Sequence, residues 1–203
     1  CPPVPIMTAS TSGLLTPALR AQEKLGWRLG IEAYTFHKFT FFETIEKTAK
    51  LGLPYVGGLS FQKVSKEISK NFTPGISDDE LQAVRLKLDE AGVRMLTYYI
   101  QSIPGDEAGC RAVFEFGRKM GIEAFMTEPA VEALPLIDRF CQEYGIKVAL
   151  HNHDRKASPH YWSPEAILRV CEGRSRYMGA CADVGYWMRG GIDPVKGVEL
   201  LKE

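Results

Sequence analysis

The sequence predicts an α/β protein in which parallel strands alternate with helices, as in a (β/α) TIM barrel. Apolar runs of strand length alternate with helical segments along most of the chain. Polar residues follow several of the strands, and an active site is assembled at these strand ends in a barrel. The helical segments also share an end signal, a glycine after which a strand begins at once. These glycines are Gly52, Gly92, Gly121 and Gly145.

The chain divides into an N-terminal tail and one partial barrel domain. Residues 1–27 are rich in Pro, Ser and Thr, so we expect a tail with a short helix over 17–25. Residues 28–203 are expected to form the barrel domain, and Ser77 followed by Glu80 predicts a capped helix start. Strands are expected over residues 29–36, 55–59, 93–100, 122–127, 146–151 and 178–182. Helices are expected over 40–51, 107–120, 131–144 and 194–202, and after Ser77 and Ser163.

Two architectures compete for this pattern, an open doubly wound sheet and a barrel. The first strand–helix junction, residues 35–39, has neither a GxGxxG motif nor a P-loop, which disfavours a nucleotide-binding doubly wound domain. Only about six βα units fit into the chain. A closed barrel of eight strands needs roughly 60 more residues, at about 30 per unit. We therefore expect that the sequence represents part of a longer barrel.

Composition excludes several classes of partner. Lys plus Arg number 25 and Asp plus Glu number 25, so no basic excess indicates nucleic acid or an anionic membrane. No apolar run has the length of about 18 residues that a transmembrane helix requires. The cysteines are scattered without CxxC spacing, which argues against a zinc module or a disulfide framework. A homo-oligomer is left open.

The first residue, Cys1, leaves the location of the protein open. A cysteine followed by a tail rich in Pro and Ser is typical of a lipid-anchored, periplasmic or secreted protein. A chain cut at this point explains the same residue, and a cytoplasmic protein is then equally compatible with the sequence.

The strongest functional signal is the stretch His-Asn-His-Asp that ends the fifth strand. Side chains alternate along a strand, so His151 and His153 share the face that lines a barrel or cleft. Glu128 follows the fourth strand and Asp183 the sixth. We predict that Glu128, His153 and Asp183 hold a divalent ion, Mn²⁺, Mg²⁺ or Zn²⁺. Such an ion polarises a carbonyl group and stabilises an enediolate, while a carboxylate moves the proton.

Further residues at strand ends are candidates for contacting a substrate. His151 lies deeper on the face of His153, as a substrate contact or as a hydrogen-bonded core histidine. His37 follows the first strand. Four aromatic residues could form a wall against which a sugar ring packs, or could belong to the core: Tyr34, Phe36, Tyr98 and Trp187.

At these residues the chain resembles the sugar phosphate isomerase/epimerase superfamily of xylose isomerase-like TIM barrels. The resemblance runs over residues 27–203 and rests on the segment 30–36, Glu128-Pro129, residues 151–153 and the segment 181–187. It implies a metal at the carboxyl ends of the strands, with Glu128 and Asp183 at ligand positions and His153 as a third candidate. Tyr186 stands where the family usually has a histidine that contacts substrate or metal, and tyrosine is a poor ligand for divalent ions.

The activity that the resemblance implies is a metal-dependent isomerase or epimerase of a keto-sugar or related polyol, acting through an enediolate. Glu128 and His153 are the expected catalytic residues, and Tyr186 joins the expected substrate contacts. A sugar dehydratase or lyase with related enolate chemistry is the alternative from the same class. A barrel without catalytic function, which binds a carbohydrate or a partner, is the alternative from another class.

Overall fold

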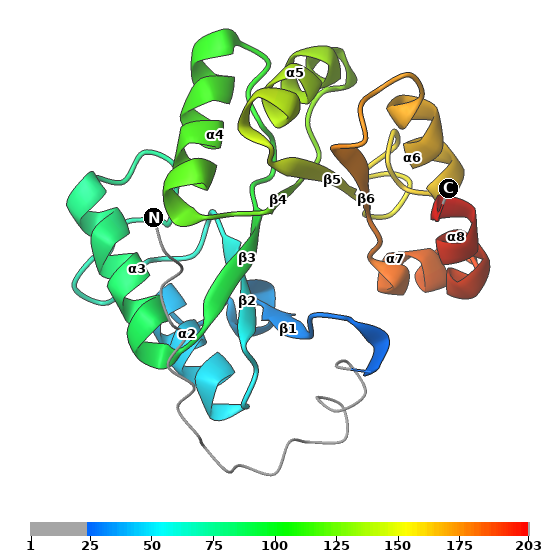
Figure 1. Ribbon diagram of the computed structural model, residues 1–203. Helices are drawn as coiled ribbons and strands as arrows, with labels where there is room; N and C mark the ends of the chain where they lie inside the picture. The colour runs from blue at the N-terminus through cyan, green and yellow to red at the C-terminus, as the bar shows by residue number, and fades with distance from the viewer. Residues whose placement is uncertain (1–23, 203) are drawn as a thin grey trace.

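A computed structural model of the chain describes residues 24–202 and shows a six-stranded parallel sheet that curves inside a layer of helices (Figure 1). The predicted tail, residues 1–27, lies almost wholly outside the described residues. The strands are β1 (Gly30–Glu32), β2 (Tyr55–Leu59), β3 (Arg94–Tyr99), β4 (Ala124–Thr127), β5 (Lys147–His151) and β6 (Met178–Cys181). The α-helices are α2 (Phe41–Lys50), α3 (Asp78–Ala91), α4 (Glu107–Met120), α5 (Leu134–Tyr144), α6 (Pro164–Cys171), α7 (Val184–Arg189) and α8 (Pro194–Leu201). Two short 3-10 helices are η1 (Ala33–Phe36) and η2 (Val131–Ala133).

The order of the strands decides between the two predicted architectures. Neighbouring strands in the sheet follow one another in sequence, β1-β2-β3-β4-β5-β6, without a reversal. A doubly wound sheet reverses its strand order at a switch point, whereas a barrel adds each strand on the same side of the last. The described residues therefore form a partial (β/α) barrel of six units, as the sequence predicts.

Side-chain alternation along each strand separates a helix-facing core from the inner face. On β5, Val148 and Leu150 are buried beneath the helices, and Tyr98 and Phe125 occupy the same layer on β3 and β4. On the opposite face the strands carry polar side chains, including His151. Because the strands are parallel, their carboxyl ends meet at one edge, and the polar inner residues collect there.

The helix boundaries follow the signals in the sequence. Ser77 and Glu80 form the predicted reciprocal capping box at the start of α3, and Thr40 with Glu43 forms another before α2. The glycines that follow the helices have φ between 64° and 69°, a left-handed conformation that costs glycine little. These are Gly52, Gly92, Gly121 and Gly145.

The first strand and the segment after the last strand differ from expectation. The expected strand over residues 29–36 ends at Glu32, because the chain turns into η1 at Ala33. After β6 the chain forms α7, a short helix that the sequence reading did not predict. Its N-cap is Asp183, whose carboxylate accepts hydrogen bonds from the backbone N–H groups of Gly185 and Tyr186.

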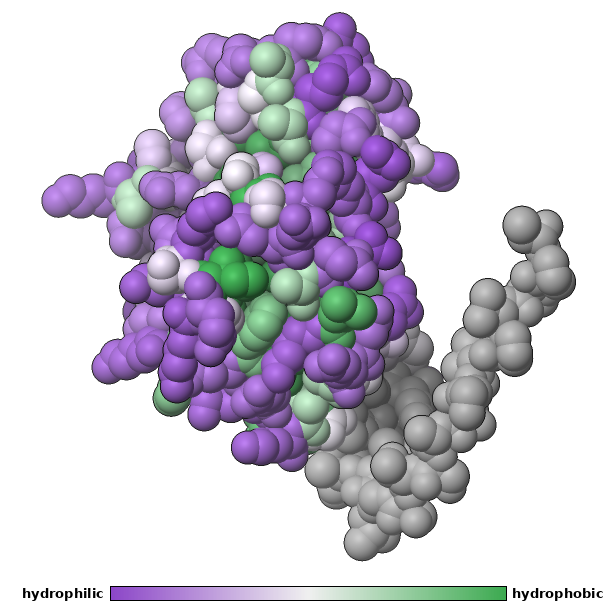
Figure 2. Space-filling view, turned by 90° about the vertical axis from the view of Figure 1, so that its left-hand side faces the viewer, coloured by the Kyte–Doolittle hydropathy of each residue, from purple (hydrophilic) through white to green (hydrophobic). Residues whose placement is uncertain are grey.

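The outer face is polar and carries ion pairs between neighbouring helices. Figure 2 shows that the side on which α3 lies in Figure 1 is mostly hydrophilic, with isolated hydrophobic residues. Lys87 of α3 pairs with Glu46 of α2 at 2.6 Å, and Lys119 of α4 pairs with Asp78 of α3 at 2.6 Å. Such exposed pairs contribute little each, about 0–1 kcal/mol. None of the described helices is long and apolar enough to cross a membrane.

Candidate active site

A cavity of about 680 Å³ opens at the carboxyl ends of the strands. Its lining residues come from all parts of the described sheet. They are Glu32, Tyr34, Thr35, Leu59, Phe61, Tyr99, Gln101, Met126, His151, His153, Cys181, Ala182, Asp183 and Tyr186. No lysine or arginine is among the described residues that line it. The cavity combines carboxyl, imidazole and hydroxyl groups with aromatic rings, which suits an uncharged polar ligand such as a sugar.

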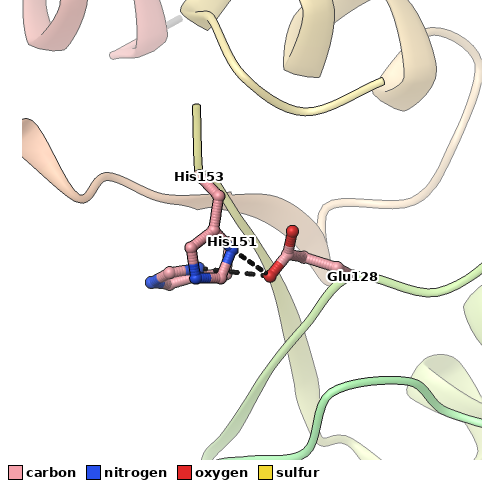
Figure 3. A group of neighbouring side chains, drawn as sticks. All are labelled: Glu128, His151 and His153. Carbon is pink, nitrogen blue, oxygen red and sulfur yellow. Dashed lines mark ion pairs between the residues drawn. The ribbon is translucent and has the colours of Figure 1, made fainter. Parts of the chain in front are cut away.

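Three side chains converge beside this cavity (Figure 3). Glu128 follows β4, His151 ends β5, and His153 lies two residues further on. Oε1 of Glu128 lies 2.6 Å from Nδ1 of His153 and 3.5 Å from Nδ1 of His151. One ligand atom from each residue lies within 4.8 Å of the other two. The structure therefore brings the ends of β4 and β5 together at these three side chains.

Asn152, between the two histidines, fixes the end of β5 to the residue after β6. Its side chain is fully buried on the face opposite to the histidines. Its Nδ2 donates to the backbone carbonyl of Asp183 at 3.0 Å, and its Oδ1 accepts from the backbone N–H of Asp183 at 2.8 Å. The alternation His-Asn-His therefore has a physical role, because the asparagine positions Asp183 relative to the histidines.

Asp183 faces the same group from the other side. Its Oδ2 lies 3.8 Å from Nε2 of His151, while its Oδ1 caps α7. The three-residue cluster thus contains His151, which the sequence placed among the substrate contacts, and Asp183 lies just beyond it. The predicted ligand set of Glu128, His153 and Asp183 stays a prediction.

Glu128 is ionised in these surroundings. Burial acts most strongly and by itself raises the pKa of the carboxyl group. His151, Ser158 and His153 act in the opposite direction and together lower the pKa below its usual value. The hydroxyl group of Tyr99 donates to Oε1 of Glu128 at 3.3 Å, and burial together with this carboxylate raises the pKa of Tyr99. Glu128 is therefore a carboxylate held in place by neighbours from β3 and β5.

The donor atoms of this cluster fit a divalent cation. Nδ1 of His151 is buried and has no hydrogen-bond partner among residues 24–202, which is an unusual state for a buried ring nitrogen. One carboxylate oxygen and two imidazole nitrogens are ligands that Zn²⁺ and Mn²⁺ accept, whereas Mg²⁺ prefers oxygen. Asp183 is placed to add a second carboxylate. The cluster could thus hold a metal, with remaining positions open toward the cavity.

Two of the predicted substrate contacts lie in the core. Tyr98 is fully buried, packs against Phe116 and donates its hydroxyl hydrogen to the carbonyl of Phe72. The next residue, Tyr99, points to the opposite face of the strand and lines the cavity. The aromatic side chain at the cavity is therefore that of Tyr99, not that of Tyr98. Trp187 is also fully buried, because α7 turns it away from the cavity and against Gly197.

The other predicted contacts lie at or near the cavity. His151 and Tyr186 line it, and the Tyr186 ring lies 4.8 Å from that of His153. Tyr34 lines the mouth and is 58% exposed, so its ring is free to contact a ligand. His37 stacks on Tyr34 at 4.8 Å and contacts the carbonyl of Tyr34 through Nδ1, but it does not line the cavity. His37 supports the mouth through Tyr34.

Glu32 and Phe61 are lining residues that the sequence reading did not single out. Glu32 is the last residue of β1. Because the predicted strand extends to residue 36, the sequence does not mark Glu32 as a strand-end residue. Phe61 lies two residues after the end of β2, and the one residue between them has no charged side chain that would indicate a site. The signal for Phe61 in the sequence is an aromatic side chain two residues after the end of the predicted strand 55–59.

The fold and these strand-end residues define the class of protein: a partial parallel barrel with a carboxylate–histidine cluster at the carboxyl ends of its strands. A solved structure of an uncharacterized protein from Parabacteroides distasonis ATCC 8503 is 32% identical in sequence, with a TM-score of 0.71. The match covers 85% of this chain and 70% of that one. The chain belongs to the same family as that protein, and it has the fold of the xylose isomerase-like TIM barrels.

More distant structures share the fold. D-psicose 3-epimerase, solved in the presence of D-fructose, is 16% identical, with a TM-score of 0.64 over 85% of this chain and 70% of its own. A xylose isomerase-like TIM barrel protein from Mycobacterium smegmatis, solved in complex with magnesium, is 10% identical, with a TM-score of 0.65 over 87% of this chain and 72% of its own. No family model and no curated protein sequence matches the chain.

Proposed function

We propose that the protein is a divalent-metal-dependent isomerase or epimerase of a keto-sugar or sugar-like polyol. The observation that carries the proposal is the convergence of Glu128, His151 and His153 beside a cavity at the carboxyl ends of a barrel sheet. Structural neighbours named as sugar epimerases, such as D-psicose 3-epimerase, support the class of substrate.

The residues of the cluster have different roles in the proposed reaction. Glu128, His151 and His153, with Asp183 beside them, would hold the ion, which supplies the polarisation of a substrate carbonyl. Glu128 is ionised and lies next to the cavity, so it can accept a proton from the carbon beside the carbonyl. His153 contacts the same carboxylate oxygen and orients it. Loss of this proton gives an enediolate, and its return to either face or to the neighbouring carbon gives the epimer or the isomer.

The residues that line the cavity suit a sugar in their polarity. Tyr34 and Phe61 form an edge-to-face pair with ring centroids 6.2 Å apart at the mouth, and apolar sugar faces pack on such rings. Gln101 and Tyr186 add hydrogen-bonding groups along the wall. Because the described lining residues include no lysine or arginine, the part of the substrate held here is uncharged.

Product analysis tests this proposal and separates it from its alternative. The protein is incubated with D-fructose, D-tagatose or D-psicose and Mn²⁺, and the products are resolved by chromatography and mass spectrometry. An epimerase or isomerase gives a sugar of unchanged mass, whereas a dehydratase gives a product that has lost one water. A protein that binds these sugars but leaves them unchanged would favour the carbohydrate-binding barrel.

A further inference from the structure

Glu32 lines the same cavity as His151 and His153, but it comes from the first strand of the sheet. It ends β1 and stands in register with Gly57 of β2, which in turn stands in register with Thr97 of β3. The three residues therefore form one layer of the inner face, across the first three strands. Glu32 lines the cavity from β1, whereas Glu128, His151 and His153 come from the ends of β4 and β5.

The chain makes room for this carboxyl group and leaves one of its two oxygens without a hydrogen-bond partner among the described residues. Oε1 of Glu32 is buried and makes no hydrogen bond to any described residue. A Cβ atom at Gly57 would lie 1.9 Å from Oε2 of Glu32 and 2.8 Å from Oγ1 of Thr97. Only glycine at position 57 leaves this space, so the carboxyl group and the Thr97 hydroxyl share a pocket that a side chain would fill. An unpaired buried oxygen is costly to the free protein and is explained by a ligand that supplies the missing bond.

The surroundings favour an uncharged carboxyl group. The backbone N–H of Ala33 acts in favour of the carboxylate, but burial outweighs it and raises the pKa of Glu32 to about 8. Burial likewise raises the pKa of Cys181 to about 12, so the neighbouring thiol adds no charge. The ionisable groups that line the same cavity are Tyr34, Tyr99, His151, His153, Cys181, Asp183 and Tyr186. No cationic lysine or arginine in the described lining is available to hold Glu32 as an anion.

We propose that Glu32 is a substrate-binding residue, whose carboxyl group both donates a hydrogen bond to and accepts one from a sugar hydroxyl group in the cavity. A protonated carboxyl has one donor and one acceptor side by side, which matches the two roles of a hydroxyl group. The sugar is then held at two places, at its carbonyl end by the cluster around Glu128 and at a remote hydroxyl by Glu32. This inference rests on the proposed function and adds a determinant of substrate choice to it.

Removing single hydroxyl groups from the ligand tests the contact. Calorimetric titration measures the affinity of the Mn²⁺-supplemented protein for D-fructose and its 3-, 4-, 5- and 6-monodeoxy analogues. For the wild type, one analogue is expected to bind about tenfold more weakly than D-fructose, because a buried hydrogen bond is lost. In Glu32→Leu, D-fructose is expected to bind as weakly as that analogue, and the difference between the two ligands disappears.

Two further variants show whether a loss of affinity comes from the lost hydrogen bond, from a changed charge or from a disturbed fold. Glu32→Gln keeps one donor and one acceptor, so it is expected to retain the affinity and the preference against the same analogue at pH 7. Above pH 8 the wild type is expected to lose affinity as Glu32 ionises, whereas Glu32→Gln is not. Glu123→Gln, at a partly exposed position that does not line the cavity, is the control and should match the wild type.

The outcomes distinguish this inference from the proposed function. If the wild type binds D-fructose and interconverts ketohexoses, but Glu32→Leu discriminates among the deoxy analogues as the wild type does, only the role of Glu32 is overturned. If D-fructose, D-tagatose and D-psicose all fail to bind to the wild type, both proposals are overturned. Tight binding with the expected Glu32 dependence but no turnover would support the contact and contradict the enzymatic function.

Discussion

Nδ1 of His153 lies 2.6 Å from Oε1 of Glu128, and this contact joins the ends of two neighbouring strands at the cavity. Neither residue is fully exposed, with side chains 30% and 13% accessible. A carboxylate and an imidazole at this distance form an ion pair when the imidazole is protonated, and both can turn toward a cation when one is bound. Nδ1 of His151 lies 3.5 Å from the same oxygen and has no hydrogen-bond partner among the described residues, so it is free to join them as a third ligand.

The first prediction concerns Glu128 as a ligand. Glu128→Gln removes the carboxylate charge while keeping the size, so the affinity for Mn²⁺ or Zn²⁺ is expected to fall at least tenfold, because even outer-shell partners of metal ligands contribute that much. Titration calorimetry measures the affinity. Glu132→Gln, at an exposed position on η2, is the matched control. Equal affinities in Glu128→Gln and the wild type would show that the cluster is not the metal site.

The second prediction concerns the asparagine between the histidines. Asn152→Ala leaves the backbone N–H and carbonyl of Asp183 without their side-chain partners, so the free energy of unfolding should fall by about 2–4 kcal/mol. Urea denaturation measures this loss. Gln142→Ala removes a side chain that also bonds to a backbone carbonyl, but at an exposed position, and should change stability by about 0.5 kcal/mol or less. A similarly small effect at Asn152 would contradict its role.

The third prediction separates two adjacent tyrosines. Tyr98→Phe removes a buried hydrogen bond to the carbonyl of Phe72 and should lower the free energy of unfolding by about 1–2 kcal/mol, with little effect on sugar binding. Tyr99→Phe removes the contact with Glu128 and should affect turnover more than stability. Denaturation and turnover of both variants check the assignment. The opposite pattern would restore Tyr98 as the residue at the site.

The shared face of His151 and His153 could be predicted from the sequence, because side chains alternate along a strand. The aromatic contact on β3 could be predicted less well. Tyr98 and Tyr99 follow one another in a run without clear alternation, so the face of each was open. The buried position of Trp187 could not be predicted, because it depends on the turn into α7. Asp183 starts that turn by capping backbone N–H groups, and a helix of six residues is too short to show a hydrophobic periodicity.

The fourth prediction follows from the ionisation of Glu32. In the unfolded chain a glutamate loses its proton near pH 4.3, whereas Glu32 in the folded protein keeps it up to about pH 8. Unfolding between these values releases a proton, so this stabilising contribution is complete below about pH 4 and is lost as pH rises toward 8. The slope is at most about 1.4 kcal/mol per pH unit for one proton.

Glu32→Gln removes this titration. Urea denaturation of both proteins between pH 5 and pH 8 should show that the wild type loses stability relative to Glu32→Gln as pH rises. A constant difference over this range would mean that Glu32 has an ordinary pKa in the folded protein. Glu123→Gln, whose partly exposed carboxylate pairs with Arg28 outside the cavity, serves again as the control.

The central claim is that a metal-assisted carboxylate removes a proton beside a sugar carbonyl. Incorporation of deuterium from D₂O into D-fructose, D-tagatose or D-psicose, followed by mass spectrometry, tests it most directly, because exchange reports the proton transfer even where no net product accumulates. Deuterium is expected at the carbon beside the carbonyl of at least one ketose, with Mn²⁺ present and the wild-type protein. It should be absent after EDTA treatment and in Glu128→Gln. No incorporation by folded, metal-bound wild-type protein would contradict the account.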